Sequence, residues 1–409
     1  MVEKTVYKIG GSCLRSEEDF NLVSEFLIRE AADAASPVPV VISAMKGETD
    51  RLKAEAIPLF RDDPFRQVAH VATLGEFVSA ELLQRALEAR GMTVTVHSPW
   101  ELDIRADGGD PDPFEAHLLG ANRKRFRECI RESEGDFAVL PGYVGVHESF
   151  QLDGRPALVA LGRGASDLIA VEAARQIGGR ARLVKDAGSI YAVDRRVVPN
   201  ARMISRMSSD MARRMLEYMR PNDQFIMDEA VRYANQHNVV IEFGSLAAPD
   251  VFSRVDPSFR PGEEDLFCAL PMRDNVACIT AQLYEPDVVP VLEALAWEDD
   301  PSKMIPFIDK VSQGVQQTLF FEAGDTEAAM ARIAPFSAET TCEKGTLLTL
   351  IDTSIRPNGQ HVLKAHRALR GIQVLNDRSS NGIIHFLVPD ESASEAANAL
   401  AEAFDLIEQ

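Results

Sequence analysis

Apolar positions in the first part of the chain follow two kinds of pattern. Short β-rich runs predict strands at 4–9, 38–44, 92–97, 137–144, 156–161, 181–185 and 238–243, and longer stretches predict helices at about 17–35, 64–90, 114–133, 166–177 and 209–219. In the stretch 64–90, apolar residues recur on one predicted helix face, and Gly91 follows as a C-cap. The residues of that face are Phe65, Val68, Val71, Leu74 and Val78. Strands that alternate with helices predict an α/β fold with a mostly parallel sheet sandwiched by helices.

The pattern changes after about residue 245. Turn residues and acids without a helical period predict a linker over 247–272. Beyond it a β-α-β-β-α-β order recurs twice and predicts two ferredoxin-like modules, at 273–344 and 345–409, with the first module's first helix at 286–296. The loop 356–359 between a strand and a helix of the second module could hold a small ligand, or be a plain turn.

Composition excludes several classes of partner. The 409 residues exceed one typical domain. With 43 Lys and Arg against 63 Asp and Glu, the formal net charge of −20 argues against nucleic acid and anionic membrane as partners. An anionic substrate must therefore be held by local cations.

Cysteine and histidine spacing bears on metals and on cellular compartment. Five scattered cysteines without a CxxC pair predict reduced thiols and a cytoplasmic protein. Neither the cysteines nor the histidines have the spacing of a metal site, so no protein-bound metal is predicted. No apolar run approaches the length that spans a bilayer.

Two segments carry candidate chemistry. Lys8 lies at the end of the first strand, just before the turn 10–12, and strand–glycine turn–helix geometry points backbone N–H groups at an anion. The segment 161–167 (LGRGASD) combines Arg163, a two-pronged donor suited to a carboxylate, with Asp167. Either segment alone could be an ordinary turn. Because ligands bind beyond the carboxyl ends of parallel strands, we expect the two segments to converge.

Several motifs in the same order give a family resemblance. YKIGGS at 7–12 resembles the opening KFGGT of aspartokinases, VISAMKGETD at 41–50 is similar to their VSAMGGVTD, and LGRGASD at 161–167 differs from their LGRGGSD at one position. The family's GE..SA helix, GFIG turn and TDVDGIYTADPR run are matched at 75–80, 142–145 and 185–196. The chain thus resembles an aspartokinase of the amino-acid kinase superfamily, which implies a catalytic domain at 1–246, and its tail resembles the paired ACT modules of that family.

The resemblance implies an activity and roles. It implies ATP-dependent phosphorylation of the aspartate side-chain carboxylate to 4-phospho-L-aspartate, with Mg²⁺ on the nucleotide, an amino-acid effector at the ACT-like modules, and a homodimer or higher oligomer. The implied catalytic residues are Lys8 and Asp167; those for aspartate are Ser43, Thr49, Glu76 (for the ammonium), Arg163 and Ser166; those for the nucleotide are Gly10, Gly11, Ser12, Lys185, Asp186, Tyr191 and Arg196. Tyr191 could instead be a packing aromatic.

The nucleotide side departs from the family pattern. The family normally has a lysine in a GAK-type segment, but no lysine occurs here between Lys185 and Lys303. We hypothesise that Lys185 supplies the missing charge; Arg220 is the other nearby cation. Two functions follow: an aspartate kinase, or a catalytically impaired or substrate-altered paralogue that acts as an amino-acid-binding partner or in a specialised pathway.

Overall fold

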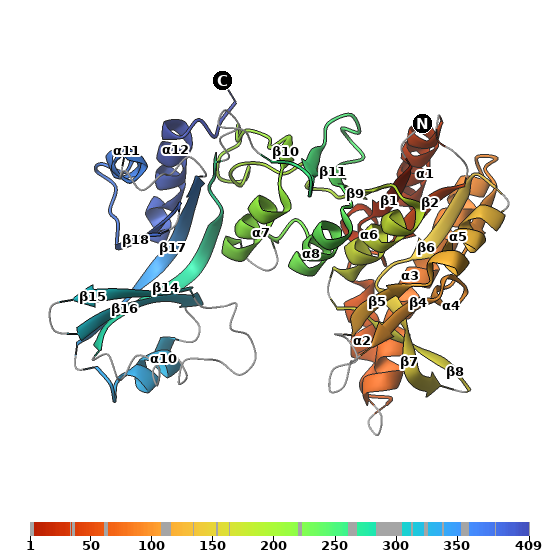
Figure 1. Ribbon diagram of the computed structural model, residues 1–409, viewed down its shortest axis with the longest axis horizontal. Helices are drawn as coiled ribbons and strands as arrows, with labels where there is room; N and C mark the ends of the chain where they lie inside the picture. The colour runs from red at the N-terminus through yellow and green to blue at the C-terminus, as the bar shows by residue number, and fades with distance from the viewer. Residues whose placement is uncertain are drawn as a thin grey trace. The chain divides into compact units, whose positions relative to one another are not determined.

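The computed structural model divides the chain into two compact units by contacts. It describes residues 4–32, 34, 37–60, 64–107, 116–133, 135–152, 154–162, 164–219, 223–260, 268–283, 305–311, 314–322, 326–337, 339–352, 360–380 and 382–408. The first unit comprises 1–190, 204–212 and 225–260, and the second comprises 191–203, 213–224 and 261–409. Figure 1 labels their elements.

The first unit is built on an eight-stranded sheet in the order β10-β12-β11-β9-β1-β2-β6-β3. Its strands are β1 (Thr5–Ile9), β2 (Val38–Ile42), β3 (Val94–Val96), β6 (Phe137–Pro141), β9 (Arg180–Val184), β10 (Arg206–Met207), β11 (Ile241–Gly244) and β12 (Ser253–Val255). Every neighbouring pair is parallel except β11 and β12. All residues of β2 and β6 are buried, as in sheets covered on both faces. The predicted parallel sheet is confirmed.

Helices cover both faces of this sheet. The helices of the first unit are α1 (Glu17–Ala31), α2 (Glu48–Ala56), α3 (Pro64–Glu88), α4 (Pro99–Leu102), α5 (Arg123–Glu132), α6 (Ala165–Ile177) and α8 (Asp228–His237), while α7 (Ser209–Tyr218) is divided between the units. α1 and α3 pack on the face that carries Tyr7 and Ile9. Because side chains alternate along a strand, Lys8 points to the opposite face, where α6 lies.

α3 buries only part of the face that its sequence predicts. Val68 is buried as predicted, but Leu74 and Val78 are exposed. The helix buries Ala69, Ala72 and Ala80 instead, together with Leu83 and Leu87. α2, α4 and α8 were not predicted.

A second, four-stranded sheet in the first unit has the order β5-β4-β7-β8. Its strands are β4 (Ile104–Asp107), β5 (His117–Ala121), β7 (Val144–Leu152) and β8 (Arg155–Ala160). The predicted helix over 114–133 is therefore wrong in its first half, where β5 precedes α5. Gly120 takes a positive φ of 106°, and Asn122 caps α5 by accepting from the Arg125 N–H. The predicted strand 137–144 likewise ends at Pro141, and β7 begins after the turn at 142–143.

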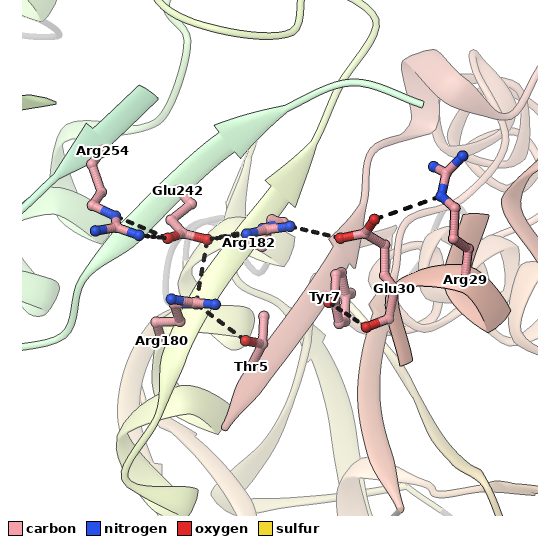
Figure 2. A network of polar contacts seen from close by, with 8 residues as sticks. All are labelled: Thr5, Tyr7, Arg29, Glu30, Arg180, Arg182, Glu242 and Arg254. Carbon is pink, nitrogen blue, oxygen red and sulfur yellow. Dashed lines mark hydrogen bonds and ion pairs between the residues drawn. The ribbon is translucent and has the colours of Figure 1, made fainter. Parts of the chain in front are cut away.

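A network of ionic contacts lies on the α1 side of the main sheet (Figure 2). Glu242 is fully buried and contacts the guanidinium groups of Arg182 (2.8 Å), Arg254 (2.7 Å) and Arg180 (3.3 Å). Arg182 also pairs with Glu30 of α1 at 2.8 Å. The network links β9, β11 and β12 to each other and to α1.

The second unit contains a seven-stranded sheet in the order β15-β16-β14-β17-β19-β18, with β13 also paired to β17. The strands are β13 (Cys268–Ala269), β14 (Met272–Leu283), β15 (Ile305–Val311), β16 (Gly314–Glu322), β17 (Thr340–Asp352), β18 (Asn376–Ser380) and β19 (Ile383–Val388), and the helices are α10 (Thr326–Ile333), α11 (Gln360–Ala368) and α12 (Ala393–Ala403). This arrangement confirms the predicted ferredoxin-like class. The predicted helix 286–296 and loop 356–359 lie outside the described residues.

Strand pairing runs across two of the predicted domain boundaries, and those boundaries stay predictions. β17 runs without a break across the predicted module boundary at 344/345, pairing with β14 through residues 340–348 and with β19 through 346–351. The predicted linker 247–272 contains β12, which pairs in the first unit's sheet, and β13. No helix in the described ranges is long and apolar enough to cross a membrane.

Candidate active site

Five parallel strands of the main sheet end at the same level. In the register of the sheet, Ile9 lies beside Ile42 and Val184, Ile42 beside Pro141, and Val184 beside Gly244. The loops that follow begin at Gly10, Ser43, Gly142, Lys185 and Ser245. Ligands of such sheets bind beyond these carboxyl ends, so this edge is the candidate site.

Glycines allow the loops at this edge to approach one another closely. A Cβ atom on Gly11 would lie 2.6 Å from the Ala44 carbonyl oxygen, and one on Gly142 would lie 2.6 Å from Cβ of Ser166. A Cβ on Gly75 of α3 would lie 2.9 Å from Cβ of Ala44. The turn after β1 therefore touches the loop after β2, which touches α3, and the turn after β6 touches the first residues of α6.

A buried carboxylate with two ammonium groups lies at the centre of this edge. Asp167 Oδ1 is 2.8 Å from Lys8 Nζ, and Oδ2 is 2.7 Å from Lys185 Nζ. Lys185 Nζ also donates to the Phe225 carbonyl oxygen at 2.6 Å. The expected convergence of the segments around Lys8 and 161–167 is therefore present.

The charges of this group favour an anion. Burial alone would raise the pKa of Asp167, but the ammonium groups of Lys185 and Lys8 hold the pKa of Asp167 below its usual range. Burial lowers the pKa of Lys185, aided by the Lys8 charge and opposed by Asp167. Two cations around one carboxylate leave an excess positive charge among largely buried side chains. An anionic group such as a phosphate would neutralise it.

The start of α6 places Ser166 and Asp167 at this edge. Gly164 is the N-cap residue with φ 85°, and Gly162 has φ 84°, a conformation that favours glycine. Ser166 and Asp167 follow in the first turn, where the helix dipole also favours an anion. Arg163 lies outside the described residues, so its predicted contact with a carboxylate stays a prediction.

Glu76 of α3 is the buried acid of the site. Its side chain is 3 % exposed, and its Oε2 atom has no hydrogen-bond partner among the described residues. Burial raises the pKa of Glu76 to about 8, against the lowering effect of the Ala44 N–H and of Lys8. Such an acceptor suits a cationic ligand group. Ser43 and Thr49 are half-buried in the loop after β2 and at the start of α2.

The predicted nucleotide residues of the first unit lie side by side. The Gly10 N–H donates to the Val184 carbonyl at 3.0 Å, and a Cβ on Gly10 would lie 3.5 Å from both Lys185 Cγ and Lys8 Nζ. Ser12 Oγ accepts from the Asp186 N–H at 3.3 Å. Two groups at this place were not predicted from the sequence: Arg15, which pairs with Asp186, and the Phe225 carbonyl. A carbonyl acceptor leaves no signal in a sequence; Arg15 had only its place after Ser12.

Tyr191 and Arg196 belong to the second unit. Tyr191 pairs with Met203 in an isolated β-bridge, and Arg196 forms ion pairs with Asp194 at 2.6 Å and Asp223 at 3.1 Å. Their role in nucleotide binding stays a prediction. Within the described residues, no group of three or more His, Cys, Asp or Glu side chains is placed to hold a metal ion.

Comparison with known proteins decides the family. Residues 3–240 match the amino acid kinase family. The chain belongs to this family. It is similar to an aspartokinase of Thermus thermophilus, with 26% identity over 98% of both chains. An aspartokinase of Mycolicibacterium smegmatis is 26% identical over 98% of this chain and 96% of its own length.

Solved structures resemble the chain over nearly its whole length, including the C-terminal part beyond the match to the amino acid kinase family. Aspartate kinase of Clostridium acetobutylicum has a TM-score of 0.73 at 15% identity, covering 99% of this chain and all of its own. E. coli aspartokinase III in complex with lysine and aspartate has a TM-score of 0.72 at 19% identity, with the same coverage. The full-length similarity confirms the resemblance to aspartokinases.

Proposed function

We propose that this chain transfers the γ-phosphoryl group of ATP to the side-chain carboxylate of L-aspartate, giving 4-phospho-L-aspartate and ADP. The observation that carries the proposal is the contact of Lys8 and Lys185 with Asp167, at 2.8 and 2.7 Å, at the carboxyl edge of the sheet. Family membership and full-length similarity to aspartokinases support the same activity.

The chemistry needs cations more than a base. A carboxylate acceptor is ionised at neutral pH and is itself the nucleophile, so no group has to remove a proton from it. What remains is to position the reactants and to stabilise charge on the phosphoryl oxygens. Lys8 and Lys185 supply ammonium groups for this purpose, and Asp167 holds both in place.

The substrate side would bind an amino dicarboxylate. Glu76, with its unpartnered buried oxygen, would accept from the substrate ammonium, and Arg163 would clamp a carboxylate. Ser43, Thr49 and Ser166 would add hydrogen bonds. A buried carboxyl group without a partner is unfavourable, and the substrate ammonium at Glu76 would compensate for that cost.

Cofactor and regulation follow the same proposal. The structure of E. coli aspartokinase III that contains aspartate and ADP is a relative with a bound nucleotide. Here Gly10, Gly11, Ser12, Lys185 and Asp186 would bind the nucleotide, and a role of Tyr191 and Arg196 in nucleotide binding stays a prediction. Mg²⁺ would be held mainly through the ATP phosphates. We propose that residues 1–246 form the catalytic domain, and that ACT-like modules at 273–344 and 345–409 bind an amino-acid effector in a homodimer or higher oligomer.

The test is ADP release by purified protein with ATP, Mg²⁺ and aspartate, with glutamate and aspartate analogues in parallel. Aspartate-dependent release, lost in Lys8→Met, is the expected result. Release with a different acceptor would show a changed substrate. Tight aspartate binding without turnover would overturn the proposal and establish a binding protein.

The role of Lys185 needs its own variant. Lys185→Ala removes one charge-stabilising donor and should lower kcat about 100- to 1000-fold. Lys124→Ala, on the exposed side of α5, is the matched control and should leave kcat unchanged. Unchanged rate and nucleotide affinity in Lys185→Ala would remove the hypothesis that this lysine replaces the family's missing one.

A further inference from the structure

The Arg15 side chain connects the two segments that form the nucleotide side. Its Nε atom donates to the Ser12 carbonyl at 3.2 Å, and its Nη2 atom is 3.1 Å from Asp186 Oδ2. The backbone N–H of Arg15 donates to Asp19 Oδ2 at 2.7 Å, which fixes the Arg15 backbone to the first turn of α1. One side chain thus joins the turn after β1 to the loop after β9, which is 171 residues away.

The Arg15 contacts are the outermost of several contacts between these two segments. At the sheet, the Gly10 N–H donates to the Val184 carbonyl at 3.0 Å. Farther out, the Asp186 N–H donates to Ser12 Oγ at 3.3 Å. The Arg15 and Asp186 side chains lie at the rim, 58% and 48% exposed. Among the contacts described between these two segments, the Arg15–Asp186 contact is the one ion pair and the one that joins two side chains.

We infer that Arg15 is a positioning residue of the nucleotide site, an inference that rests on the proposed function. Lys185 directly precedes Asp186, and its Cγ atom would lie 3.5 Å from a Cβ on Gly10. The spacing between the glycine turn and residues 185–186 therefore sets how backbone N–H groups and the Lys185 ammonium face one phosphate chain. The rigid fork of a guanidinium can hold that spacing from both sides, through the Ser12 carbonyl and the Asp186 carboxylate.

The exposure of the pair limits the size of the effect. An exposed ion pair contributes up to about 1 kcal/mol, which corresponds to about a fivefold change in a dissociation constant. Arg15→Ala should therefore raise the Kd for Mg-ATP two- to fivefold, within that limit. The KM for aspartate should stay unchanged, because the residues predicted to bind aspartate lie outside the two segments that Arg15 joins.

The experiment measures the Kd for Mg-ATP by calorimetry on the full-length protein, together with both KM values and kcat. Arg15→Lys should recover part of the loss, because it keeps the charge without the fork. Arg29→Ala is the matched control: Arg29 also lies on the α1 segment, is 57% exposed and pairs with Glu30 at 3.7 Å. It should change none of the constants.

A double-mutant cycle tests whether Arg15 acts through Asp186. If Arg15 acts through Asp186, the Asp186→Ala, Arg15→Ala double variant should bind Mg-ATP no more weakly than Asp186→Ala alone. Unchanged Kd in Arg15→Ala, or equal loss in both KM values, would overturn the inference. Because calorimetry measures binding directly, it decides the role of Arg15 even in a protein without turnover. Binding of Mg-ATP without turnover would refute the proposed function alone. A protein that binds no nucleotide would refute both the proposed function and the role of Arg15.

Discussion

The buried carboxyl group of Glu76 should make the ligand-free protein less stable as the pH rises. Burial raises the pKa of Glu76 from 4.5 to about 8 in the folded protein, while the unfolded chain has the ordinary value. Between these two values the unfolded state loses the proton and the folded state keeps it. The free energy of unfolding therefore falls by about 1.4 kcal/mol for each pH unit.

The sign and size follow from the surroundings of Glu76. Lys8 and Lys53 and the Ala44 N–H favour the ionised form, and burial outweighs them. The stability is fully present below pH 4.5 and is lost as the pH rises to about 8. Over that interval the loss is on the order of 4–5 kcal/mol. Glu76→Gln stays neutral, so the variant should be under about 1 kcal/mol more stable than the wild type at pH 5, and several kcal/mol more stable at pH 8.

Urea unfolding at pH 5, 6.5 and 8 measures this difference. The chain has two tryptophans, Trp100 and Trp297, and only Trp100 lies in the first unit. A Trp297→Phe background therefore lets fluorescence report the first unit alone. Glu81→Gln, on the exposed side of α3, is the control and should show no pH-dependent difference. Parallel stability curves for wild type and Glu76→Gln from pH 5 to 8 would refute the reasoning.

Three further variants test other parts of the structure. Glu242→Gln removes the charge that three arginines share (Figure 2), and should cost about 3–5 kcal/mol in urea unfolding of the first unit; a loss below 1 kcal/mol would contradict a buried ion network. Gly142→Ala places a Cβ 2.6 Å from Ser166 Cβ, so kcat should fall at least tenfold; wild-type kcat would show that α6 can yield without loss. Burial lowers the pKa of His385 to about 4, so the free energy of unfolding should fall by about 3 kcal/mol as the pH falls from 6.5 to about 4. Acid unfolding of His385→Gln should lack that loss; equal losses in the wild type and the variant would contradict the prediction.

Local sequence predicted some elements well and others poorly, for identifiable reasons. The strands β2 and β6 were predicted because strands covered on both faces are continuous apolar runs. β1 and β9 were predicted although each carries charged residues, Lys8 in β1 and Arg180 and Arg182 in β9. The helix predicted over 114–133 failed because Gly120 and Asn122 divide it into β5 and α5. The predicted buried face of α3 was right at Val68 and wrong at Leu74 and Val78, which are exposed.

For the site, the sequence determined which chemical groups are available and in what order along the chain. Lys8, Glu76, Asp167 and the glycine turn could be named from motifs because each motif is local. Tertiary structure alone decided that Lys185 shares Asp167 with Lys8, that the Phe225 carbonyl holds Lys185, and that Arg15 reaches Asp186. The physical reason is the parallel sheet: its register brings the ends of β1, β2, β6, β9 and β11 to one edge, where groups far apart in sequence meet.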